Sequence, residues 1–209
     1  KGLKLGFILF VVSEIMFFLA FFWGYFHSSW SLSIFIGRQW VPMGVVPINP
    51  FYVALTNTLL LVYSGAWVTV AHYSLILRKM KDFKDSLAIT ILFGSVFTLL
   101  QFYEYNVSPF GIADGIYSSA FFLTTFFHGF HVVVGTVLLI ICYLRFCGYQ
   151  YESDKHYFFE AATVYWHFVD FVWLGVYSIF YFACWDSYVY FLNYNSWEDY
   201  YHFVMRYFY

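Results

Sequence analysis

The sequence has 209 residues, of which 62% are hydrophobic and only 11% are charged. A soluble domain covers its surface with polar side chains and is roughly 25% charged, so the composition excludes an ordinary soluble protein. The net charge of −2 gives no basic surface for nucleic acid, and three scattered cysteines form no disulfide or metal pattern. Together with a mean hydropathy of +0.68, these values predict an all-α, polytopic transmembrane helical bundle.

Five stretches are long and apolar enough to cross a bilayer, since a span needs about 20 residues. They cover about residues 5–26, 51–77, 86–105, 117–143 and 160–183. Pro42, Pro47 and Pro50 place a structured loop before the second span. The predicted organisation is a five-helix bundle over residues 1–184 and an aromatic-rich C-terminal extension over residues 185–209. We interpret the extension as an interfacial tail rather than a sixth span.

Basic residues are unequally divided between the two ends of the predicted spans. Eight fall on one side: Lys1, Lys4, Arg78, Lys79, Lys81, Lys84, Arg145 and Lys155. Only Arg38 and Arg206 fall on the other. Because positive loops stay in the compartment of synthesis, we expect the N-terminus on that side and the C-terminus on the opposite side.

The first predicted span contains one charged side chain near its middle, Glu14, with Phe10, Phe17, Phe18 and Phe21 at nearby helical positions. An ionisable group at such a depth costs about 3 kcal/mol or more, which makes it a candidate functional residue. One interpretation is a carboxyl with a proton or lipid role. The other is a protonated glutamic acid that hydrogen-bonds a neighbouring helix and has no salt-bridge partner within this chain.

Two predicted spans carry polar stripes at helical spacing. The fourth has Thr124, His128, His131 and Gly135, and the fifth has Glu160, Thr163, His167 and Asp170. We expect the stripes to face each other and to form a polar intramembrane network, which His72 and Glu104 could join near the membrane surfaces.

A metal or haem site is the alternative interpretation of these histidines. His128 and His131 have a chelating spacing, but di-iron bundles repeat Glu-x-x-His on two helices, and this pattern is missing from the sequence. We therefore predict that the chain itself binds no metal and no haem, and that the stripes are hydrogen-bonding groups that could also have a proton role.

Five segments in order resemble subunit III of cytochrome c oxidase, mitochondrial type: KGLKLGFILFVVSEIMFFLAFFWGYFHSS, PINP, LLQFYEY, FHGFHVVVGT and FEAATVYWHFVDFVWL. The similarity runs nearly without gaps from residue 1 to about residue 181. It implies a subunit of the respiratory oxidase in the mitochondrial inner membrane, with its N-terminus on the matrix side. This complex couples electron transfer from cytochrome c to O2 with proton translocation.

The resemblance also implies roles for individual residues. In the family, haem and copper belong to subunits I and II, and subunit III is non-catalytic: it stabilises subunit I, supports proton uptake and holds phospholipid. The family's intramembrane carboxylate falls on Glu14, its FHGxH histidines on His128 and His131, and its WHFVD pair on His167 and Asp170. Arg145 matches a position near a phospholipid headgroup, and we expect an anionic lipid such as cardiolipin there.

Two differences from the family affect these expectations. The family has seven spans, and this sequence begins at what would be the third; we expect a separate polypeptide to supply the other two helices. The tail also continues some two dozen residues past the usual end.

Two alternative functions remain: a subunit of a related quinol oxidase, and an independent transporter or proton channel. A transporter should show repeat symmetry or broken spans, and neither stands out.

Overall fold

The computed structural model describes residues 2–31, 40–42, 44–148 and 156–194, and these residues form helices and loops without any strand. The long helices are α1 (Gly2–Trp30), α2 (Leu55–Ile76), α3 (Met80–Val107), α4 (Ile116–Cys147) and α5 (Tyr157–Val176). A π-helical turn, η2 (Pro50–Ala54), precedes α2, and a second one, η3 (Tyr177–Phe182), joins α5 to α6 (Ala183–Tyr194). Within these described ranges, five helical stretches are long and apolar enough to cross a membrane, which confirms the predicted fold class.

The last helical stretch extends beyond the predicted boundary at residue 183. It continues through η3 into α6, so residues 185–194 of the predicted interfacial tail are helical. The sequence contains no Gly or Pro between Gly175 and Tyr194, and therefore no residue that ordinarily ends a helix. Residues 195–209 lie outside the described part of the chain.

Helices α2 to α5 pack around the indole ring of Trp166 on α5, which is fully buried. The ring lies against two glycines: an added Cβ would be 2.6 Å from it at Gly94 on α3 and 2.9 Å from it at Gly135 on α4. The indole Nε1 donates a hydrogen bond of 2.9 Å to Ser64 Oγ on α2. Because glycine lets helices approach closely, one large side chain connects four helices.

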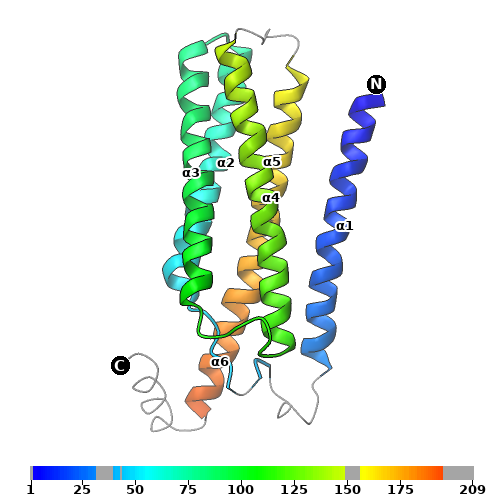
Figure 1. Ribbon diagram of the computed structural model, residues 1–209, viewed down its shortest axis with the longest axis vertical. Coiled ribbons are helices and arrows are strands. Elements are labelled where there is room, and N and C mark those ends of the chain that lie inside the picture. The colour runs from blue at the N-terminus through cyan, green and yellow to red at the C-terminus, as the bar shows by residue number, and fades with distance from the viewer. Residues whose placement is uncertain (1, 32–39, 43, 149–155, 195–209) are drawn as a thin grey trace.

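Helix α1 lies at the edge of this bundle, beside α4 and α5 (Figure 1). In its most apolar segment, only 6% of the residues are buried. Aromatic rings make much of its contact with the bundle: the Phe17 ring lies 5.0 Å from Phe127 on α4, and Phe10 lies 6.3 Å from Tyr165 on α5. Most of α1 therefore presents apolar side chains away from the bundle.

Candidate functional site

The contact between α1 and α4 contains a pair of ionisable side chains near the middle of both helices. Glu14 Oε2 and His131 Nε2 are 2.7 Å apart. The exposed fraction of the side chain is 21% for Glu14 and 10% for His131. The Phe18 ring, also buried here, lies 5.1 Å from the His131 ring. The two polar groups therefore satisfy each other within an aromatic environment.

The hydrogen bonds of His131 fix how many protons the pair holds. His131 Nδ1 lies 2.6 Å from the carbonyl oxygen of Phe127, which can only accept, so Nδ1 donates. The 2.7 Å contact between Nε2 and Glu14 Oε2 then requires one further proton. The pair is either a glutamic acid with a neutral imidazole or a carboxylate with an imidazolium. Its net charge is zero in both cases, which suits the interior of a membrane.

Glu14 therefore has an ionisable partner within this chain, which the sequence did not predict, and the contact is a salt bridge only when the proton lies on His131. Helices α1 and α4 run antiparallel side by side (Figure 1), which brings the middle of α1 against His131. A single carboxyl in an apolar sequence shows that a partner is needed, but it does not show which of several polar residues on other helices will supply it.

The two polar stripes do not face each other as expected. His128 Nε2 donates to the backbone oxygen of Val169 on α5 at 3.2 Å. His167, however, lies 3.2 Å from Thr69 Oγ1 on α2, and Asp170 packs against the backbone of Gly65, also on α2. The α5 stripe therefore faces α2, because α5 packs between two neighbours and its periodicity does not distinguish them.

The remaining predicted polar residues lie at opposite ends of the bundle. Near the start of α5, the rings of His72 and His156 are 5.7 Å apart, and Glu160 is half-buried one turn into the helix. Near the end of α3, Glu104 Oε2 accepts hydrogen bonds from Gln101 Nε2 at 3.2 Å and Tyr181 OH at 3.0 Å. These groups form separate clusters and not one continuous network.

Several polar residues that contact the predicted site residues or the Trp166 indole were not predicted. They are Ser64, Thr69, Gln101, Tyr165 and Tyr181. Thr69 donates to the Gly65 carbonyl at 2.9 Å, so it accepts from His167. Gln101 could have been found, since it lies one turn before Glu104; Tyr181 has no comparable signal in a chain with 21 tyrosines.

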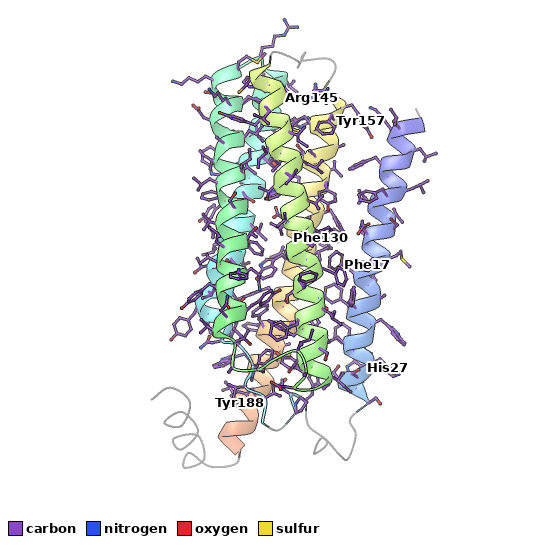
Figure 2. The ribbon with its side chains drawn as sticks, viewed as in Figure 1. Phe17, His27, Phe130, Arg145, Tyr157 and Tyr188 are labelled. Carbon is purple, nitrogen blue, oxygen red and sulfur yellow. The ribbon has the colours of Figure 1, made fainter. Side chains whose placement is uncertain are left out.

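Arg145 lies in the last turn of α4, at the same end of the bundle as Tyr157 (Figure 2). Its guanidinium carbon is 5.2 Å from the centre of the Phe158 ring, a cation–π distance. This contact holds the guanidinium at the end of the bundle, where a span meets the membrane surface. Within the described ranges, no three or more His, Cys, Asp or Glu side chains are arranged to hold a metal ion.

Comparison with known proteins places the chain in a family. The sequence model of cytochrome c oxidase subunit III matches residues 1–187. Cytochrome c oxidase subunit 3 of Tetraodon nigroviridis is 51% identical over 181 residues, covering 87% of this chain and 69% of the relative. The Drosophila melanogaster subunit is 49% identical over 86% of this chain and 69% of its own length. The Patiria pectinifera subunit is 48% identical over 88% and 70%. A match over nearly the whole bundle at about half identity shows that this chain belongs to the cytochrome c oxidase subunit III family.

Proposed function

We propose that this chain is a non-catalytic core subunit of the respiratory oxidase that stabilises subunit I, binds phospholipid and supports proton uptake. As a family member with five apolar helices, it is a multi-pass subunit of respiratory complex IV in the mitochondrial inner membrane. The complex transfers electrons from cytochrome c to O2 and translocates protons. Haem and copper would be held by subunits I and II.

The observation that carries this proposal is the Glu14–His131 pair. It holds one proton and joins a weakly packed helix to the bundle. The pair keeps one exchangeable proton inside the span, which can lie on Glu14 Oε2 or on His131 Nε2 without a change in net charge. It can therefore support proton uptake without being the sole route.

The test of the proposed function is to purify the intact complex and record its haem spectrum and subunit content. A chain that purifies without an oxidase would contradict the proposal.

The apolar outer surface of α1 supports a role in assembly. Leu3, Leu9 and Met16 are each more than half exposed, which requires lipid or protein around them. We propose that helices of other oxidase subunits cover part of this surface. A density map of the assembled complex tests this proposal: protein helices should pack along the outer surface of α1, and lipid along that entire surface would contradict it.

The orientation follows from where the basic residues lie. The start of α1, the α2–α3 turn and the end of α4 lie at one end of the molecule (Figure 1). Most of the basic residues belong to these segments, and positive segments remain in the compartment of synthesis. We therefore propose that this end faces the matrix and that α6 lies on the intermembrane-space side.

We predict that the chain, separated from the complex, contains no stoichiometric haem, copper or iron. His131, His167 and His128 are used in hydrogen bonds to Glu14, Thr69 and Val169, which competes with metal coordination. Elemental analysis is the measurement. One tightly held transition metal per chain would contradict the prediction.

We predict an ordered phospholipid, of anionic type such as cardiolipin, at Arg145. A guanidinium at the end of a span on the positive side can bind a phosphate with two parallel hydrogen bonds, and the contact with Phe158 preorganises it. The measurement is a density map of the complex. Clear acyl chains elsewhere but only protein or water at Arg145 would overturn the prediction.

A further inference from the structure

A cavity of about 460 Å³ lies at the end of the bundle opposite Arg145, where η2 and the loop before it, the end of α3 and α6 meet. Tyr188 of α6 lines it and is at the opposite end from Arg145 (Figure 2). The volume falls in the usual range for small-ligand sites. Because the walls belong to the ends of spans, the cavity opens at the membrane–water interface.

Glu104 is one of the residues that line this cavity, although only 4% of the residue is exposed. Two donors, Gln101 Nε2 and Tyr181 OH, are directed at the same oxygen, Oε2. The other oxygen, Oε1, is buried and has no hydrogen-bond partner among the described residues. A buried carboxyl oxygen without a donor is costly, and it indicates a missing group that can donate a hydrogen bond.

The rest of the lining determines the charge of that group. Four aromatic residues, Tyr52, Tyr103, Trp185 and Tyr188, line the same cavity, and among the described residues that line it there is no Lys, Arg or His. Aromatic rings attract cations through their π faces, and one carboxyl adds negative charge. With a single carboxyl, the site lacks the several oxygen ligands of a Ca²⁺ or Mg²⁺ site. The lining therefore favours an organic cation.

We propose that this cavity binds a primary ammonium group carried by an amphipathic molecule, and that the headgroup of an ethanolamine phospholipid is its source. A primary ammonium has three N–H donors, one of which would satisfy Glu104 Oε1 after a small side-chain adjustment, while the aromatic rings surround the charge. A quaternary ammonium such as choline has no N–H and leaves Oε1 unsatisfied. The site is separate from Arg145, and the inference rests on the proposed function, since it specifies one phospholipid that the subunit would bind.

The test uses the purified, delipidated oxidase complex and vesicles of phosphatidylcholine that contain labelled phosphatidylethanolamine. Retained lipid is counted per complex by native mass spectrometry. Glu104→Gln removes the charge, and Trp185→Leu removes one aromatic wall without touching the carboxyl. Tyr63→Leu is the matched control, because Tyr63 is an exposed tyrosine on α2 that does not line the cavity.

We expect each cavity variant to lose one ethanolamine lipid per complex relative to the wild type and the Tyr63 control. The affinity of the Glu104→Gln complex for the labelled lipid should fall roughly ten- to hundredfold, as for the loss of a charge-assisted hydrogen bond. That of the Trp185→Leu complex should fall by a smaller factor, as for the loss of a cation–π contact. If soluble O-phosphoethanolamine competes with the labelled lipid, the cavity is still an ammonium site, but its ligand is a soluble amine and not a lipid. If the Glu104→Gln variant fails to assemble into the complex, the lipid retention of the Trp185→Leu variant alone tests the proposal. Equal retention of labelled phosphatidylcholine or phosphatidylglycerol, or no loss in the assembled variants, would overturn the proposal.

Discussion

Replacing Trp166 with alanine is expected to lower the free energy of unfolding of the bundle by about 3–5 kcal/mol, the usual cost of removing a buried indole. The ring is fully buried, fills the space over Gly94 and Gly135, and donates to Ser64. Its loss leaves a void between four helices and a hydroxyl without its donor. The measurement is the temperature at which the chain is lost from the purified oxidase complex.

Phe171→Ala provides the matched control for this measurement. Phe171 lies on α5, the helix that carries Trp166, with 77% of the residue exposed, so its replacement removes an aromatic ring without creating a cavity. We expect an effect of about 0.5 kcal/mol or less, as for other surface changes. Equal losses of stability in the two variants would show that Trp166 does not hold the four helices together.

Replacing His131 with leucine is expected to weaken the attachment of α1 by about 1–3 kcal/mol, the cost of leaving a buried polar group unsatisfied. The change removes the hydrogen-bond partner of Glu14 near the middle of the helix. Other contacts of α1 with the bundle lie near its two ends: Lys4 Nζ is 5.0 Å from the centre of the Tyr157 ring, and Tyr25 OH is 2.8 Å from Cys184 Sγ. The measurement is the stability of the assembled chain against pulsed proteolysis.

A double variant separates the missing partner from a general loss of packing. Glu14→Leu combined with His131→Leu removes both polar groups, and replacing both partners with apolar side chains is often nearly neutral. We expect the double variant to be more stable than His131→Leu alone, and Phe130→Leu, at an exposed position on the same helix, to change little. Additive losses from the two single changes would contradict the coupling.

The fold class was predictable because five apolar stretches separated by charged or proline-containing loops allow few arrangements in a membrane. The helix ends were less predictable, since hydropathy marks the lipid-facing part of a helix and not its last hydrogen bond. The stretch over residues 185–194 shows this, because it continues as a helix beyond the apolar window.

The candidate site was predictable in its members but not in its pairings. Glu14 and His131 were both recognised as unusual for a membrane span, yet their contact depends on the position of α1 beside α4. Asp170 and His167 were expected opposite α4 and lie against α2. Helical periodicity groups residues on one face, whereas the choice of neighbouring helix depends on packing such as the fit of Trp166 over Gly94 and Gly135.

The most direct measurement is the rate of O2 consumption with reduced cytochrome c in an assembled complex that carries Glu14→Gln. The glutamine amide can donate to His131 Nε2 and preserve the link between α1 and α4, but it cannot release a proton. Haem content and the amount of this subunit per complex are the controls. If the pair serves to hold α1 and assists proton uptake without being its obligate route, assembly and the rate of electron transfer stay close to wild type. Loss of electron transfer in a fully assembled complex would contradict this role and make Glu14 an obligate proton carrier.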